Sequence, residues 1–217
     1  EFPLPFEFSP EIDFSVEKET LHKMLINTSF ATSTDQTRIA ICGPLLKFST
    51  QGLSCIATDG KRLAIMTEQM TAPSEGQCII PPKTNNALLK LMAGDGDVII
   101  AIDEKHICFN FTSEHGHPTT INSQLITSNF PNYAAIIPDG SEYEVAINRQ
   151  EFLNAMKRMA LILTESDHGV KLDFNEGELV IRSQTQDDES QEDIKVQFDH
   201  CASIAFNPHY LIEPLKR

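Results

Sequence analysis

Apolar residues repeat along the chain with two different periods. Short runs rich in β-branched and aromatic residues are bounded by Gly, Asp and Asn, which is typical of strands that end in turns. Such runs cover residues 55–58, 78–81, 97–103, 106–111, 119–126, 169–174 and 178–184. Residues 17–30, 83–92 and 148–163 instead repeat apolar side chains every three or four positions, as amphipathic helices do. The pattern predicts an α+β protein with more strands than helices.

Each predicted helix has one apolar face. These faces are formed, in order, by Leu21, Met24 and Leu25, by Leu88, Leu91 and Met92, and by Phe152, Met156 and Met159. Asn148 precedes the third helix and Glu151 lies three residues later, a spacing that predicts an N-cap and its capping-box partner. We therefore expect the third helix to begin directly after Asn148.

The same pattern occurs twice in the chain. Residues 14–31 align with 145–162, each reading as a short strand followed by a helix; residues 45–59 align with 170–184, and 78–92 with 203–217. Because three matches in order at a near-constant offset indicate a repeat, we predict a first domain over residues 1–140 and the first half of a second over 141–217. The prolines and turn residues of residues 129–144 are typical of a linker.

Composition limits the class of protein. A chain of 217 residues with 41% apolar residues can form one large or two ordinary domains. The five cysteines are odd in number and have no CxxC spacing, which favours free thiols in a reducing compartment. No apolar run reaches the roughly 18 residues that a membrane span requires, and the first residues do not resemble a signal peptide. We expect a cytoplasmic protein.

Positive charge is concentrated in the predicted helices. The chain has a net charge of −14, yet the three helices together carry +4, which leaves −18 for the remainder. Lysines on a solvated helix face are ordinary, but their repetition on the helices of an acidic protein favours a surface that attracts phosphates. The predicted DNA-facing residues are Lys18, Lys23, Lys83, Lys90, Arg149, Lys157 and Arg158.

The sequence gives little support to catalysis or metal binding. His115 and His117 lie in a polar turn, where a solvated loop is a better interpretation than a metal site. The adjacent pairs Asp167-His168 and Asp199-His200 are expected to point to opposite faces of strands, and no nucleophile motif accompanies them. We predict no catalytic residues, no metal and no cofactor. The acidic residues 186–193 are expected to form a solvated loop.

Several motifs together resemble a known family. The stretches ATDGKRLA (residues 57–64) and FPNY (130–133), with TRIAICGPLLKF, IIPPKTNNALLKLM and NRQEFLNAMKRMALI, are similar to those of bacterial DNA sliding clamps, the beta subunits of DNA polymerase III. The resemblance covers nearly the whole chain, and it implies the family's middle domain over residues 1–140 and the first half of its last domain over 141–217. It also implies a homodimeric ring, with sheets outside and helices lining a channel around double-stranded DNA.

The resemblance further implies a docking pocket for short peptides. In the family, partners such as the polymerase III alpha subunit and the clamp loader insert a peptide with a leucine or phenylalanine anchor. The implied pocket residues are Arg38, Ile41, Thr58, Gly60, Lys61, Arg62, Leu63, Pro131 and Ile136. Gly60 is expected to let a peptide backbone approach, and Leu63 and Ile41 to form an apolar floor.

The implied function is that of a non-catalytic processivity factor, which tethers the replicative polymerase to DNA. Two alternatives remain open at this point: a β-rich protein-interaction module that does not bind DNA, and a hydrolase on a repeated α+β scaffold. The interaction module would tolerate charge reversal on the helices, and the hydrolase would require titratable groups that converge in a cleft.

Overall fold

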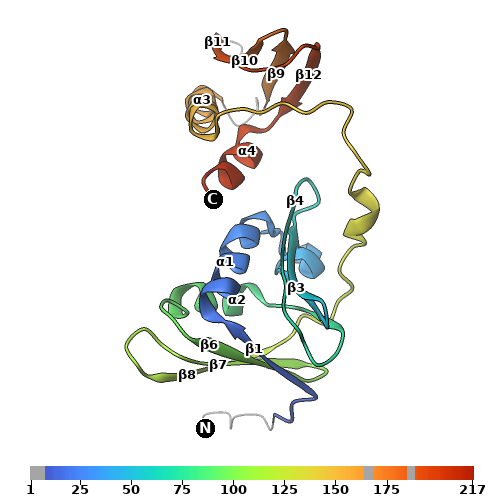
Figure 1. Ribbon diagram of the computed structural model, residues 1–217, viewed down its shortest axis with the longest axis vertical. Helices are drawn as coiled ribbons and strands as arrows, with labels where there is room; N and C mark the ends of the chain where they lie inside the picture. Colours follow the sequence, from blue (N-terminus) through green and yellow to red (C-terminus); the bar gives the residue numbers. More distant parts are fainter. Residues whose placement is uncertain (1–7, 164–168, 185–188) are drawn as a thin grey trace. The chain divides into compact units, whose positions relative to one another are not determined.

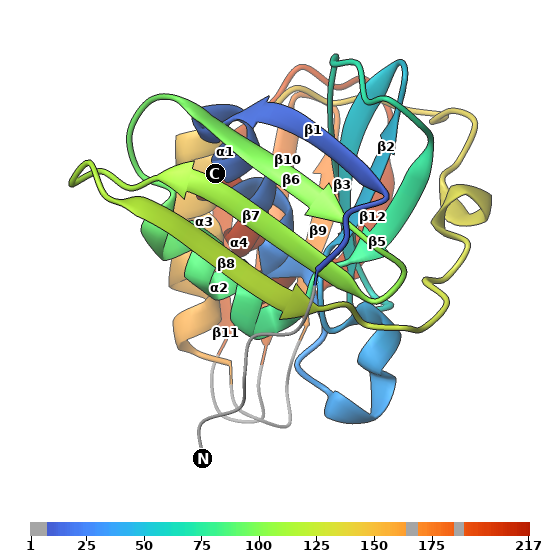
Figure 2. The ribbon, with the colours of Figure 1, turned by 90° about the horizontal axis from the view of Figure 1, so that it is seen from below.

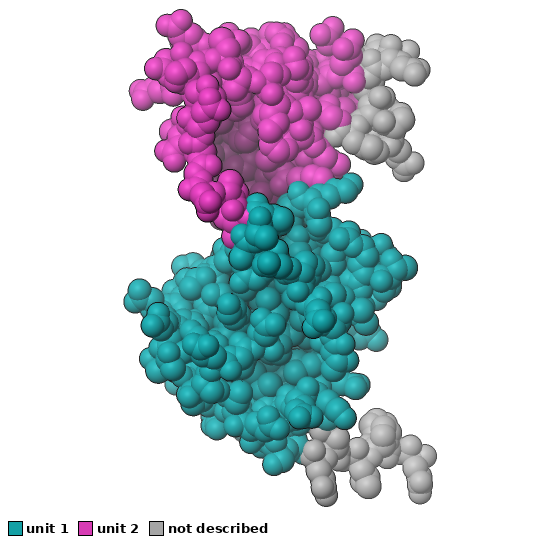
Figure 3. Space-filling model, turned by 90° about the vertical axis from the view of Figure 1, so that its right-hand side faces the viewer, with its two compact units in different colours: residues 1–136 teal, residues 137–217 magenta. Residues whose placement is uncertain are grey.

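The computed structural model describes residues 8–163, 169–184 and 189–217. The chain forms two compact units, Glu1–Ile136 and Ile137–Arg217, coloured separately in Figure 3.

Unit 1 contains two four-stranded antiparallel sheets, with strand orders β4-β3-β2-β5 and β1-β6-β7-β8. The first sheet is formed by β2 (Leu45–Ser49), β3 (Gly52–Thr58), β4 (Leu63–Glu68) and β5 (Gly76–Ile79), and the second by β1 (Ile12–Glu17), β6 (Asp97–Ile102), β7 (His106–Thr112) and β8 (Pro118–Gln124). Helices α1 (Lys18–Thr28) and α2 (Pro82–Leu91) complete the unit, with short 3₁₀ turns η1 (Ser29–Ala31), η2 (Gln36–Ile41) and η3 (Tyr133–Ile136). This arrangement confirms the predicted α+β class.

The core of unit 1 lies between its helices and its two sheets (Figures 1 and 2). Helix α1 packs on β3 and β4 and buries Leu21, Met24 and Leu25 completely, as its period predicts. The same core includes Ile100 and Phe109 from the other sheet. Because both sheets share one apolar cluster with the helices, unit 1 folds as a single body.

Helix α2 differs from its prediction at one apolar position. Pro82 stands at its first turn, where the missing N–H would have no helical partner, and Leu88 and Met92 are buried. Leu91, which we assigned to the same face, is 45% exposed. The buried stripe instead includes Thr84 and Asn85, which lie one turn before Leu88. The outward face of α2 is therefore partly apolar.

Unit 2 has one antiparallel sheet, two helices and its own core. It consists of α3 (Arg149–Leu161), β9 (Val170–Asn175), β10 (Glu178–Gln184), β11 (Glu189–Lys195), β12 (Ala202–Phe206) and α4 (Pro208–Leu215), with strand order β11-β10-β9-β12. Asn148 caps α3, since its Oδ1 accepts a hydrogen bond from the backbone N–H of Glu151 at 3.0 Å. A strand and a proline-opened helix, β12 and α4, follow in the same order as β5 and α2, as expected for a repeat.

Two predictions in unit 2 were wrong. Residues 145–147 form no strand, although the aligned segment of unit 1 is β1. Strand β1 pairs with β6, which follows α2, and no strand follows α4 in the part of unit 2 that the structure describes.

The second wrong prediction is the loop at the acidic stretch 186–193. This stretch contains most of β11, while its residues 186–188 lie outside the described residues. β11 is an edge strand whose only buried side chain is Ile194, so its sequence is almost entirely polar.

Candidate functional site

The turn between β3 and β4 is built around the side chain of Asp59. Its Oδ1 accepts hydrogen bonds from the backbone N–H groups of Lys61, at 2.8 Å, and Arg62, at 3.1 Å. Thr58 closes the turn from the other side, because its hydroxyl donates to the carbonyl of Arg62 at 2.7 Å and accepts from the N–H of Gly60 at 3.0 Å. An Asp that bonds the backbone two and three residues later is a common way to fix a tight turn. The hydroxyl proton of Thr58 is therefore engaged in a hydrogen bond inside the turn.

Gly60 has two reasons to lack a side chain. Its φ is +88°, a conformation that L-residues with a Cβ rarely adopt. A Cβ at this position would also lie 2.6 Å from Nη2 of Arg38. Arg38 reaches the turn from η2, and its Nη1 donates to the carbonyl of Asp59 at 2.8 Å. The space over Gly60, which we expected to admit a peptide backbone, is occupied by the guanidinium of Arg38.

Arg62 connects the turn to η1, the short 3₁₀ turn that follows α1. Its Nε lies 3.0 Å from Oδ2 of Asp59, and its Nη2 donates to the carbonyl of Phe30 at 2.8 Å. The guanidinium also lies over the ring of Phe30, at 5.4 Å from its centroid, in a cation–π arrangement. Because these contacts fix Arg62 from several directions, the turn is held firmly against the body of unit 1.

The outer face of the sheet β4-β3-β2-β5 is apolar near this turn. Leu45, Ile56 and Ile79 are buried on this face, and partly buried residues packed against them are Leu63, Ile126, Phe130 and Tyr133. Ile65, directly opposite Ile56 in the β3–β4 register, is 42% exposed. Antiparallel sheets commonly leave one face in water, but that face is then polar. An apolar outer face is a feature that binding surfaces share.

The structure brings five of the predicted pocket residues together at the turn, namely Arg38, Thr58, Gly60, Arg62 and Leu63, with Lys61 exposed at its tip. Ile41, which we expected in the apolar floor, is buried, with only 2% of its surface exposed. Pro131 and Ile136 are exposed in the segment that ends unit 1, where 68% of Ile136 is accessible.

Sequence reasoning missed the residues that cover the apolar face. Phe130 and Tyr133 pack on the sheet from the segment after β8, with ring centroids 6.3 Å apart in an edge-to-face pair. The FPNY stretch carried the signal, since two aromatics three residues apart beside prolines and asparagines are able to pack together on an apolar surface. Asp59 was also missed, although it organises the turn.

The predicted DNA-facing residues differ in exposure and in their contacts. Lys23, Lys83, Lys90 and Lys157 are exposed on the helices. Lys18 was wrongly assigned: it is 2% exposed, and its Nζ donates to the carbonyl of Thr112 at 2.8 Å. Lys18 lies one turn before Leu21 on the buried stripe of α1, so it points toward β7 rather than outward.

The two arginines of α3 are exposed but engaged. Arg158 forms a two-pronged ion pair with Glu192 of β11, which raises the pKa of the Arg158 guanidinium through the hydrogen bonds that Glu192 accepts. Arg149 donates through Nη1 to the carbonyls of Leu215, at 2.9 Å, and Arg217, at 3.3 Å. Carbonyls carry no net charge, so Arg149 retains its own, whereas that of Arg158 is offset by Glu192.

Sequence comparison supplies the family. Residues 15–132 match the family described as DNA polymerase III beta subunit, central domain, and residues 134–217 match the one described as DNA polymerase III beta subunit, C-terminal domain. The chain belongs to the DNA polymerase III beta subunit family. The resemblance carried by ATDGKRLA and FPNY is thereby confirmed.

Relatives of known name and structure agree with this family. The beta sliding clamp of Chlamydia pneumoniae is 30% identical over 220 residues, which cover 100% of this chain and 59% of that protein. The crystal structure of the DNA polymerase III subunit beta from Pseudomonas aeruginosa matches with a TM-score of 0.93 and 29% identity, over 100% of this chain and 59% of that one. A structure of the Pseudomonas aeruginosa sliding clamp bound to griselimycin matches with a TM-score of 0.91 and 30% identity, over 99% of this chain and 58% of that one.

This chain thus spans about 59% of the length of the beta subunits that it matches.

The remaining expectations concern metal binding, catalysis and membranes. In the part of the chain that the structure describes, no three His, Cys, Asp or Glu side chains are grouped so as to hold a metal ion. Asp199 and His200 contact each other, with Oδ1 and Nε2 3.2 Å apart, although we expected them to diverge; both are exposed. Asp167 and His168 lie outside the described residues. None of the described helices is long and apolar enough to cross a membrane.

Proposed function

We propose that this chain is the central and C-terminal part of a ring-shaped processivity factor that encircles duplex DNA and tethers the replicative polymerase. The observation that carries the proposal is the match of both beta-subunit domains, in order, along the chain. The mechanism is topological: a closed ring raises the effective concentration of the polymerase at the primer end without chemistry of its own. The factor is a non-catalytic, cytoplasmic homodimer in this proposal.

The apolar outer face near the β3–β4 turn supports docking of partner peptides. Leu63 borders the buried cluster of Leu45, Ile56 and Ile79. A leucine or phenylalanine side chain of a peptide placed beside Leu63 would bury its apolar surface against this cluster, which favours binding. Lys61 at the tip of the turn adds an exposed positive charge beside this face. The polymerase III alpha subunit and the clamp loader are the proposed peptide donors.

The exposed lysines of the helices support attraction of DNA. Lys83 and Lys90 lie two turns apart on α2, and with Asn86, Ala87 and Leu91 they line a shallow hollow of about 390 Å³. Phosphate contacts from lysines hold a duplex without reading its bases. A surface of this kind lets a ring slide, because no position on the DNA is preferred.

Peptide docking is tested by fluorescence anisotropy. A labelled Gln-Leu-Ser-Leu-Phe peptide is titrated with the full natural polypeptide that contains this sequence. Leu63→Ala is expected to weaken binding by about 1–3 kcal/mol, the scale of a buried apolar anchor. Ile99→Ala is the control, because Ile99 is an exposed aliphatic side chain on the other sheet. Equal binding by wild type and Leu63→Ala would remove the turn from the proposal.

The DNA-facing role is tested by loading of the polypeptide onto circular duplex DNA. Lys83→Glu combined with Lys90→Glu should abolish retention on the circle, whereas Lys47→Glu with Lys105→Glu makes the same charge change at two exposed lysines outside the helices. Retention of the α2 variant would remove Lys83 and Lys90 from the DNA-facing role, whereas no retention of the unchanged polypeptide would favour an interaction module that does not bind DNA.

A further inference from the structure

Strand β5 is an edge of its sheet, and part of its backbone faces outward. The N–H of Ile80, just after the strand, donates to the carbonyl of Pro44 on the β2 side, while the carbonyl of Ile79 accepts from the N–H of Ile126 on the opposite side. Backbone groups alternate in direction along a strand, so those of Gln77 also face away from β2. Among the described residues nothing bonds to the backbone N–H or carbonyl of Gln77.

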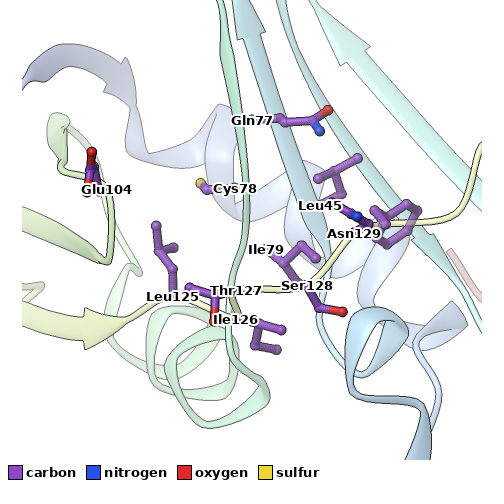
Figure 4. A pocket seen from close by; sticks show the side chains of 11 residues that line it. Leu45, Gln77, Cys78, Ile79, Glu104, Leu125, Ile126, Thr127, Ser128 and Asn129 are labelled. Atoms are coloured by element: carbon purple, nitrogen blue, oxygen red, sulfur yellow. The ribbon is translucent and has the colours of Figure 1, made fainter.

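A groove runs beside this free edge. A hollow of about 530 Å³ lies between β5 and the segment that follows β8, with Glu104 from the β6–β7 turn on one side and Leu45 and Asn129 on the other (Figure 4). A second hollow of about 390 Å³ continues past Glu75 and Gly76. Gln77 lines both hollows, and the second is also lined by Lys47, Phe48 and Ser49 of β2. Because the outward carbonyl of Ile79 already accepts from the N–H of Ile126, the free part of the edge covers residues 75–77. At about 3.3 Å per residue this length, roughly 10 Å, accommodates three extended residues.

The groove has a negative charge at each end. Glu104 and Glu75 are exposed, and the described residues offer neither carboxylate a hydrogen bond or an ion pair. Lys47 is the only cationic residue among the described ones that line the two hollows. An occupant with basic side chains would therefore satisfy two carboxylates while its backbone paired with β5.

We propose that the free edge of β5 binds an extended, basic segment of a partner protein by strand addition. The N–H and carbonyl of Gln77 pair with the backbone of the segment, and Glu75 and Glu104 take its lysines or arginines. One contact of this type already exists, because the N–H of Ile126 donates to the carbonyl of Ile79 at 3.2 Å. Leu45, Ile79 and Phe130 are shared with the apolar face beside Leu63. Gln77, Glu75 and Glu104 lie outside that face, so variants at these three positions test the inference separately from the proposed function.

The test uses the 217-residue chain and the labelled peptide acetyl-Lys-Val-Lys-Val-Lys-amide in fluorescence anisotropy. Gln77→Pro removes the outward N–H without breaking a bond inside the sheet, because proline is tolerated where an edge strand faces solvent. Gln77→Thr is its matched control, since it changes the side chain and keeps the N–H. Glu104→Gln removes one charge at an exposed position and does not threaten folding, which far-UV circular dichroism checks for every variant.

The proposal expects binding by wild type and Gln77→Thr, a loss of roughly five- to tenfold in Gln77→Pro, and a several-fold loss in Glu104→Gln. A peptide with every amide N-methylated keeps its charges but cannot form strand hydrogen bonds, and it should not bind. Equal binding of the methylated peptide, or of Gln77→Pro, would reduce the effect to charge attraction and overturn the proposal. No binding at all would also overturn it. Sedimentation showing a wild-type dimer and a Gln77→Pro monomer would overturn it too, because a second copy of the chain would then be the occupant.

Discussion

Substitution of Gly60 by alanine measures how tightly Arg38 covers the turn. An alanine at φ +88° costs about 1–2 kcal/mol of backbone strain. Its Cβ would lie 2.6 Å from Nη2 of Arg38, so the guanidinium must move and its hydrogen bond to the carbonyl of Asp59 is lost. A hydrogen bond of this kind contributes about 1 kcal/mol. We expect Gly60→Ala to destabilise unit 1 by about 2–3 kcal/mol.

The chain contains a glycine that isolates the strain. Gly116, in the turn between β7 and β8, has φ +79°, and a Cβ added to it would have no atom within 4 Å, so Gly116→Ala should cost the strain alone. Both glycines lie in unit 1, and urea unfolding followed by far-UV circular dichroism reports both substitutions on the same transition. Each substitution lowers the free energy of unfolding, and the difference between the two decreases measures the effect of the contact with Arg38.

The same difference should disappear when Arg38 is removed. In an Arg38→Ala background, Gly60→Ala and Gly116→Ala are expected to cost the same to within about 0.5 kcal/mol, as a double-mutant cycle requires for a contact that no longer exists. The reasoning is refuted if the two alanines already cost the same with Arg38 present. It is also refuted if the excess cost at Gly60 survives without Arg38.

Three further outcomes follow from burial and charge. Lys18→Met should leave affinity for duplex DNA unchanged, whereas Lys90→Met should lower it and reduce the salt slope by about one, as measured by titration at several salt concentrations. Hydrogen bonds from Lys171 and then Ser203 lower the pKa of Asp173, so its stabilising effect is present above its ordinary pKa, near pH 4, and is lost as the pH falls through the lowered value. Urea unfolding at a series of pH values should therefore show that Asp173→Asn destabilises unit 2 at about pH 7 and approaches the wild type in strong acid. Burial raises the pKa of the Cys55 thiol to about 12, so a disulfide-exchange dye at about pH 8 should label the exposed Cys201 and reach Cys55 only after urea is added.

Helices could be predicted from the sequence because their signals are local. The predicted segments 17–30, 83–92 and 148–163 became Lys18–Thr28, Pro82–Leu91 and Arg149–Leu161, with ends that differ by one or two residues. An apolar stripe and a capping side chain both lie within the segment they define. The prediction of a strand at residues 145–147 was wrong. These residues correspond to β1 of unit 1, and β1 forms a strand because it pairs with β6, which begins only at Asp97. Non-local pairing cannot be read from the strand itself.

The burial of Lys18 was predictable in principle. Lys18, Leu21, Leu25 and Thr28 follow each other at helical spacing, and all four are buried on the same side of α1. A lysine at the first position of such a stripe can extend its aliphatic chain along the core and bond a carbonyl at its tip. The total charge of a helix therefore predicts less than the position of each charge on the helical face.

The site residues near the turn were selected by resemblance, and the structure gives some of them a different physical role. Gly60 lacks a side chain where Arg38 lies, and the hydroxyl of Thr58 bonds within the turn. A peptide that approached the backbone of Gly60 would first have to displace the guanidinium of Arg38 and break its 2.8 Å hydrogen bond to the carbonyl of Asp59. Because Arg38 is exposed, water replaces that bond, and displacement costs at most about 1 kcal/mol, or roughly fivefold in affinity. Burying one leucine on the apolar face beside Leu63 would offset that cost, so the covered glycine is compatible with the peptide docking that we propose.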